Sequence, residues 1–134
     1  MEKRIRISTK ATGAIEALVT SKNPRTADAI WDALPLKGKA NRWGDEIYFS
    51  IAVSLKEENA RAEVEVGSVA YWPPGKALRI FFGPTPVSQH GEPRAYSPVN
   101  VFAKLAMYPT IFKKVHEDDQ VTSKKSRAEV AAEH

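Results

Sequence analysis

The residues best suited to chemistry lie in one short segment, where a guanidinium, a carboxylate, a phenol and an indole fall within a few positions of each other. Arg42 offers a permanent positive charge and a planar fork of N–H donors. Glu46 and Tyr48 alternate with apolar residues, so both side chains are expected on one face of a strand. Such groups, brought together, can orient a polar ligand. The competing interpretation is a surface salt bridge between Arg42 and Glu46, which would contribute about 0–1 kcal/mol.

Large aromatic side chains at the ends of apolar segments form the second candidate group. Trp43 precedes a glycine in a turn-like corner, and Trp72 ends an apolar segment before Pro-Pro-Gly. Phe82 ends the next apolar segment, before Gly-Pro-Thr-Pro. Rings at such positions can form the wall of a site for an apolar ligand or a proline-containing peptide, or they can close one end of the core. Trp31, which falls in a helical pattern, is expected to be a core residue.

These two groups together predict a ligand-binding groove. Aromatic rings would supply its apolar wall, Arg42 and Glu46 its charge, and Tyr48 and Asn100 its hydrogen bonds. The predicted site consists of Arg42, Trp43, Glu46, Tyr48, Trp72, Phe82 and Asn100. The expected partner is a small molecule or a short proline-containing peptide, and no cofactor is expected.

Metal-dependent and hydrolytic chemistry find no support in the sequence. The chain has no cysteine, and His90, His116 and His134 are dispersed without ligand-spaced neighbours. Ser88 and Ser97 lack the histidine and acidic partners of a catalytic triad. We therefore predict neither a metal site nor a hydrolase.

Length, charge and hydropathy indicate one ordinary globular domain. The chain has 134 residues, of which 43% are hydrophobic and 27% charged. Its formal net charge of +4 is scattered, so a nucleic-acid partner is not expected. No segment is long and apolar enough to be a signal peptide or a membrane span, so we expect a cytoplasmic protein with no membrane partner.

Alternating apolar residues and turn signals predict short strands around one early helix. Asn23 and Pro24 are typical of a helix start, as N-cap and first-turn proline. The apolar positions that follow share one helical face over 24–34: Ala27, Ile30, Trp31 and Leu34. Strands are predicted at 3–8, 14–19, 36–41, 46–55, 68–72, 77–82 and 98–107, with residues 62–66 leading into Gly67 and a single helical turn at 109–115.

This pattern favours an all-β fold, a closed or nearly closed β-barrel with the helix covering one end. Closure would leave no long sheet edge to protect. The barrel domain is expected over 1–115. Residues 116–134 form a charged C-terminal extension, in which 121–124 could add an edge strand and the last ten residues are expected to be frayed or weakly helical.

Four segments carry a resemblance to a known family: 41–49, 67–75, 81–86 and 97–101. Together they resemble a family of small prokaryotic proteins of unknown function with a cyclophilin-like fold, and the resemblance extends over residues 2–115. It implies an eight-stranded cyclophilin-like barrel with a helix capping one end.

A weaker likeness to true cyclophilins implies an alternative function, peptidyl-prolyl isomerisation. The hairpin with Phe81 and Phe82 is similar to the one that supplies the proline pocket in cyclophilins, although the chain lacks their Phe-His-Arg and Gln-Gly-Gly runs. Phe82 would line the proline pocket, and Arg42 or Arg79 would donate to the imide nitrogen. Otherwise Arg79 simply points from its strand to solvent. A third hypothesis is an assembly role, such as a homodimer formed through a strand edge.

Overall fold

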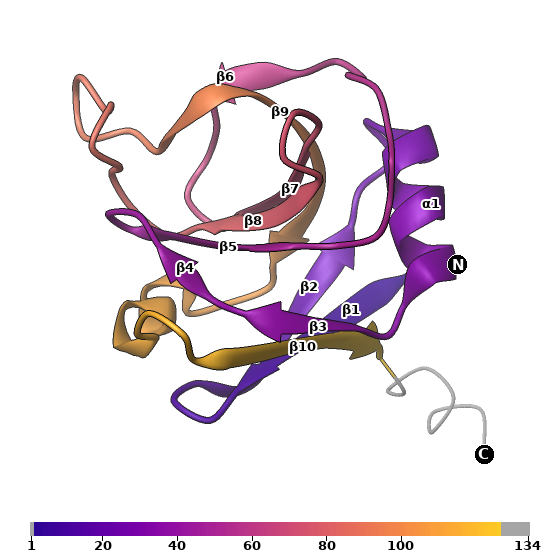
Figure 1. Ribbon diagram of the computed structural model, residues 1–134, viewed down its shortest axis with the longest axis horizontal. Coiled ribbons are helices and arrows are strands. Elements are labelled where there is room, and N and C mark those ends of the chain that lie inside the picture. The colour runs from indigo at the N-terminus through magenta and orange to yellow at the C-terminus, as the bar shows by residue number, and fades with distance from the viewer. Residues whose placement is uncertain (1, 127–134) are drawn as a thin grey trace.

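A computed structural model describes residues 2–126, which form a strongly bent sheet with one α-helix beside it (Figure 1). Residues 127–134, most of the segment expected to be frayed, lie outside the described residues. The elements in chain order are β1 Arg4–Thr9, β2 Gly13–Val19, α1 Pro24–Ala33, β3 Leu36–Lys39, β4 Asn41–Arg42, β5 Glu46–Ser50, β6 Arg61–Glu63, β7 Ser68–Trp72, β8 Ala77–Phe81, β9 Arg94–Leu105, the 3-10 helix η1 Pro109–Lys114 and β10 Gln120–Lys125.

The sheet has ten strands in the order β3-β10-β1-β2-β9-β7-β8-β5-β4, with β6 paired to β9 alone. The mainly-β prediction is therefore confirmed, whereas the prediction of an eight-stranded barrel closed by hydrogen bonds is wrong. The two end strands, β3 and β4, are consecutive in the chain and are separated only by Ala40. The curl of the sheet is thus completed by one segment that changes partner, from β10 to β5.

Two hydrogen bonds and one ring contact hold this seam together. The N–H of Ala40 donates to the carbonyl of Asp119 at 2.8 Å, and the carbonyl of Ala40 accepts from the N–H of Asp118 at 2.7 Å. The ring of Phe49 from β5 lies against Gly38 of β3, where a Cβ would come within 2.8 Å of the ring. A residue without a side chain at position 38 therefore lets Phe49 cover the gap between the two end strands.

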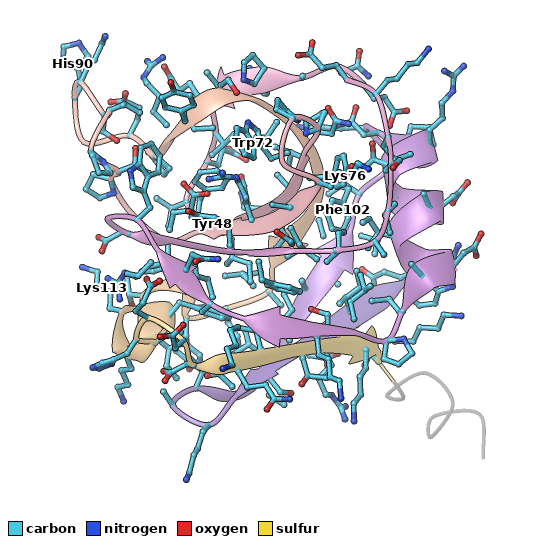
Figure 2. The ribbon with its side chains drawn as sticks, viewed as in Figure 1. Tyr48, Trp72, Lys76, His90, Phe102 and Lys113 are labelled. Carbon is cyan, nitrogen blue, oxygen red and sulfur yellow. The ribbon has the colours of Figure 1, made fainter. Side chains whose placement is uncertain are left out.

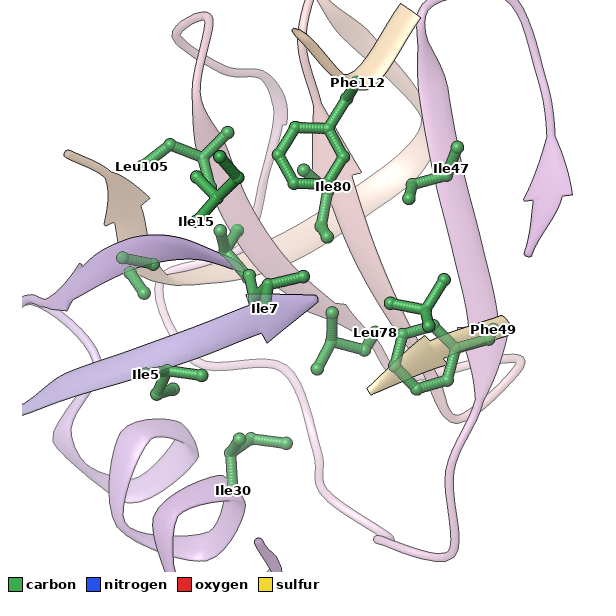
Figure 3. Close-up of a cluster of buried hydrophobic side chains, with 14 of the residues drawn as sticks. Ile5, Ile7, Ile15, Ile30, Ile47, Phe49, Leu78, Ile80, Leu105 and Phe112 are labelled. Atoms are coloured by element: carbon green, nitrogen blue, oxygen red, sulfur yellow. The ribbon is translucent and has the colours of Figure 1, made fainter. Parts of the chain in front are cut away.

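The main core fills the inside of the curled sheet (Figure 3). Alternate residues of β1, β5 and β8 point inward, as their sequence periodicity predicts. Helix α1 covers one side with Ala27 and Ile30, while Trp31 is half-buried at the margin. The largest contributors from the strands and η1 are Ile5, Ile7, Ile47, Phe49, Tyr71, Leu78, Ile80, Phe82 and Phe112.

A second, smaller core lies on the opposite face of β7 and β8. It contains Ala70 and Phe81 from these strands, covered by Val64, directly after β6, and by Ala95 and Val99 from the first half of β9. Strands β7 and β8 are therefore buried on both faces, which explains why nearly every residue in them is buried.

The strand predicted over 46–55 ends at Ser50 as β5. Beyond it the chain leaves the ladder and runs beside α1, although Ile51 is still buried and Val53 and Leu55 still pack on the core. The hydroxyl of Tyr71 holds this stretch, donating to the carbonyl of Val53 and accepting from the N–H of Leu55. After Ser50, the alternation in the sequence thus reflects burial of one side of the chain, although this segment is not part of a strand.

The C-terminal strand differs from its prediction. Residues 121–124, expected at a sheet edge, belong to β10, which pairs with β1 on one side and β3 on the other. The predicted C-terminal extension thus contributes β10, an internal strand of the sheet. No helix within residues 2–126 is long and apolar enough to cross a membrane.

The N-terminus of α1 is capped from a distance. The side chain of Asn23 makes no cap hydrogen bond, and its amide donates instead to the carbonyl of Val101 at 2.6 Å. The carboxylate of Glu58 accepts from the N–H groups of Arg25 and Thr26 at 3.1 and 2.9 Å, and from the Thr26 hydroxyl. Burial opposes ionisation of Glu58, but these hydrogen bonds outweigh it and lower the pKa of the carboxyl. The predicted cap at Asn23 is therefore replaced by Glu58.

Replacing Glu58 with Gln should lower the free energy of unfolding at neutral pH by about 1 kcal/mol, because the helix loses a charged acceptor at its N-terminus. Since the folded-state pKa lies below the unfolded value of 4.5, this contribution is present above that pH and fades as the pH falls further. Urea unfolding of Glu58→Gln and of the control Glu57→Gln, at an exposed neighbouring position, measures it. Equal losses in both variants would contradict the assignment.

Candidate functional site

The outer face of β5, β8 and β7 brings a polar cluster together at the margin of the smaller core. Tyr48 and Arg79 are direct cross-strand partners in the β5–β8 ladder. Trp72 lies on the neighbouring strand β7, two residues along from Ala70, the partner of Arg79. Because side chains two residues apart share a face of a strand, Glu46 and Trp72 project on the same side as Tyr48 and Arg79.

Arg79 is the centre of this cluster. Its guanidinium carbon lies 4.2 Å from the centre of the Tyr48 ring and 4.3 Å from that of the Trp72 ring, so the cation is flanked by two aromatic faces. Its Nη1 donates to Oε2 of Glu46 in a buried ion pair. The interpretation in which Arg79 points to solvent is wrong, because its side chain is only 5% exposed.

Glu46 lies beneath Arg79 and is fully buried, with no exposed surface. Burial raises the pKa of its carboxyl to about 7, although Arg79 acts in the opposite direction through its charge and its hydrogen bond. Oε1 of Glu46 and Nε of Arg79 are buried without a hydrogen-bond partner among the described residues. The pair is therefore incompletely satisfied within this part of the chain.

A pocket of about 220 Å³ opens above Arg79. The rings of Trp43 and Tyr96 face each other edge-on across 6.5 Å, and Tyr96 is 70% exposed at the rim. Nε1 of Trp72 donates to the hydroxyl of Ser97 at 2.7 Å, which fixes the indole. Figure 2 shows Tyr48 and Trp72 on the same part of the molecule. The residues that line the pocket are Trp43, Tyr48, Trp72, Arg79 and Tyr96.

The loop before β9 is internally braced and leads directly to the rim. The carboxylate of Glu92 accepts from the N–H groups of Gln89 and His90 and from Nε of Arg94. The backbone hydrogen bonds from Gln89 and His90 are the main cause that lowers the pKa of Glu92 to about 2. Tyr96, two residues after Arg94 in β9, thus follows directly on a well-defined loop.

The structure brings four of the seven predicted site residues together. Trp43, Tyr48 and Trp72 line the pocket, and Glu46 lies beneath it in contact with Arg79. The strand alternation that set Glu46 and Tyr48 opposite the core predicts this arrangement.

The other three predicted residues lie elsewhere. The guanidinium of Arg42 donates to the carbonyls of Gly44, Lys113 and Val115 and to Asp45, and packs 5.0 Å from the ring of Phe82. Phe82 belongs to the main core, with 1% exposure. The side chain of Asn100 is completely buried and joins β9 to the segment after β5 through Lys56 and Glu58.

Tyr96 was not predicted as a site residue, and Arg79 was considered only as an isomerase donor. A signal for Arg79 is present in the sequence, because Leu78, Ile80 and Phe82 alternate with it and must face the core. The same parity places Phe82 in the main core inside the curled sheet and Phe81 in the smaller core on the outer face. Tyr96 carries no comparable signal, since the polar stretch with Gly and Pro before it indicates a loop, whereas the structure places Tyr96 in β9.

A larger hollow of about 910 Å³ lies between β6, β7 and the start of α1. Its charged side chains are exposed and therefore hydrated, so the hollow holds no buried charge that would mark a site. It is lined by Lys22, Asn23, Asn59, Ala60, Arg61, Glu63, Val64, Glu65, Ser68 and Val101. Within residues 2–126 no group of three or more His, Asp or Glu side chains is placed to hold a metal ion.

Comparison with known proteins identifies relatives of the fold. The family model described as Cyclophilin-like matches residues 3–124. The solution structure of the hypothetical protein AF2241 from Archaeoglobus fulgidus is 43% identical, with a TM-score of 0.79 over 93% of this chain and 95% of that chain. The structure of McbB in complex with tryptophan is 14% identical, with a TM-score of 0.72 over 91% of this chain and 44% of that one, and this likeness shows the fold alone. A search of curated proteins found no match.

Replacing Glu46 with Gln should change how stability depends on pH. Between the unfolded pKa of 4.5 and the folded value of about 7, folded Glu46 holds a proton that the unfolded chain has lost. The free energy of unfolding of the wild type should therefore fall as the pH rises through this range, by on the order of 3 kcal/mol in total. Gln cannot ionise, so Glu46→Gln should lack this fall in urea unfolding. Glu63→Gln, at an exposed ion pair, is the control, and parallel profiles for the wild type and Glu46→Gln would refute the assignment.

Proposed function

This chain belongs to the cyclophilin-like family, and on that premise we propose that it is a binding protein that takes a small molecule or a short peptide in the pocket above Arg79. The observation that carries the proposal is a buried guanidinium at the floor of a pocket whose other lining residues are all aromatic. Ligand sites of proteins commonly combine apolar walls with a few fixed polar groups in this way.

The walls favour a flat apolar group. The exposed edges of Trp43 and Tyr96 at the rim, with Tyr48 and Trp72 below, offer ring contacts to an entering planar group. The volume of about 220 Å³ is below the 300–1,000 Å³ typical of sites for drug-sized ligands. We therefore expect the bound part to be a single ring system or one side chain of a peptide.

Prolyl isomerisation is the second candidate. A proline ring would fit between aromatic walls, and a guanidinium donor nearby could draw the imide lone pair out of resonance and so lower the barrier of about 20 kcal/mol. Arg42 is poorly suited to this role because its guanidinium already donates to four groups. In this candidate the donor is Arg79. NMR exchange spectroscopy on a short Ala-Pro peptide distinguishes it, since a protein that only binds leaves the cis/trans exchange rate unchanged.

The binding proposal is tested by NMR titration of labelled protein, with the three tryptophan indole N–H signals as reporters. Free tryptophan and the Ala-Pro peptide serve as probes, the first because a protein of the same fold has been solved with it. We expect the signals of Trp43 and Trp72 to shift while that of Trp31, on α1, stays in place. Truncating the wall in Trp72→Ala should weaken binding about tenfold or more, because one aromatic face is lost.

Trp31→Ala is the matched control, since this tryptophan lies at the margin of the main core and outside the pocket lining. Its affinity for the probes should equal that of the wild type. Saturable binding that shifts the Trp31 signal and leaves Trp43 and Trp72 unmoved would place the site elsewhere and sink the proposal.

A further inference from the structure

One edge of the Arg79 guanidinium makes no hydrogen bond within residues 2–126. Nη1 donates to Glu46, and Nε is buried without a partner. Within residues 2–126, Nη2 of Arg79 makes no hydrogen bond either. Nε and Nη2 form the side edge of a guanidinium, so two parallel N–H donors are left on a side chain that is 95% buried and that lines the pocket.

We propose that the pocket takes a planar organic carboxylate, with its two oxygens on the Nε–Nη2 edge of Arg79 and its ring among the aromatic walls. This inference rests on the proposed function and names the chemical class of its ligand. A carboxylate matches two parallel N–H donors with two acceptors, which a single carbonyl oxygen cannot do. Burial of Nε without a partner is unfavourable, so its satisfaction by a ligand adds to the ligand's affinity.

The flanking rings select for this mode of contact. Tyr48 and Trp72 occupy the regions above and below the guanidinium, each within about 4.3 Å. A ligand can therefore reach Arg79 only in its plane, through the edge that Glu46 does not occupy. A second ring stacked on the guanidinium is excluded for the same reason.

Glu46 determines the local charge. When it is ionised, the Arg79–Glu46 pair is neutral and an incoming carboxylate meets a like charge. When it is protonated, Arg79 keeps its positive charge and attracts the ligand. Since burial raises the pKa of Glu46 to about 7, carboxylate binding should be accompanied by proton uptake near neutral pH.

Among the groups around Glu46, Glu46 itself is the acid whose protonation sets the charge beside Arg79. Arg79 faces it from β8, and Tyr48 is its neighbour on β5. Asp45, next in the chain, bonds to Arg42 and lies 3.8 Å from Lys113, on the side of η1. On the segments that cover the outer face, Val64, Ala95 and Val99 supply the buried contacts and do not titrate. The charged residues there are Arg61 and Glu63 of β6, both exposed, and Arg94 of β9, which pairs with Glu63 and Glu92, while Tyr96 lies at the rim.

The test compares three probes of nearly equal size: phenylacetate, phenylacetamide and phenethylamine. Isothermal titration should show phenylacetate binding at least tenfold more tightly than the other two at about pH 6. Phenylacetate stays ionised throughout, so its affinity should fall as the pH rises through about 7, whereas that of the amide should not change. In Glu46→Gln, phenylacetate should still bind more tightly than phenylacetamide, but its affinity should no longer fall as the pH rises.

Arg79→Lys keeps the charge and removes the fork, and should abolish most of the preference for phenylacetate. Arg6→Lys, at an arginine that also pairs with a glutamate but lies on β1, is the control and should behave as the wild type. Equal affinity for acid and amide in the wild type would overturn the carboxylate assignment while leaving the proposed pocket intact. Absence of binding by all three probes, with no shift of Trp43 and Trp72, would overturn both.

Discussion

Burial of β7 and β8 on both faces is the constraint on which the rest of the structure depends. The inner face, with Leu78 and Ile80, requires the curled sheet and α1 as a cover. The outer face, with Phe81, requires a second cover, which β6 and the first half of β9 provide. Strand β9 is twelve residues long because its first half pairs with β6 and its second half with β7 and β2. The pocket lies at the margin of this outer cover, beside the rings of Trp43 and Tyr96.

A buried ion pair at this margin is a poor device for stability alone. Desolvation of two charges commonly offsets their attraction, and apolar residues of similar volume are often as stabilising or more so. The aromatic faces of Tyr48 and Trp72 compensate the guanidinium only in part, since Nε of Arg79 and Oε1 of Glu46 stay unpaired. The arrangement is better suited to recognition, in which an incompletely satisfied group is completed by a ligand.

The parts of the fold that follow from local periodicity could be predicted, and those that depend on distant partners could not. Alternation around Ile47 and Phe49 correctly indicated which face of β5 is buried and placed Glu46 and Tyr48 opposite it. The same alternation could not show where pairing stops, because the Tyr71 hydroxyl replaces the ladder after Ser50. Likewise the helix cap comes from Glu58, far along the chain, although Asn23 has the appropriate side chain. In the site, Trp43 and Trp72 were predictable from their positions at strand ends, whereas Tyr96 lies at the start of β9, in a stretch whose sequence indicated a loop.

The position of β10 between β1 and β3 has a consequence for biosynthesis. Until residues 120–125 have left the ribosome, β1 lacks its second neighbour and β3 has no partner in the sheet. A nascent chain would therefore display two unpaired strand edges for most of its translation, and such edges invite pairing between chains. Native topology can be completed only after this strand has been synthesised, so β1 and β3 keep an unpaired edge until late in translation.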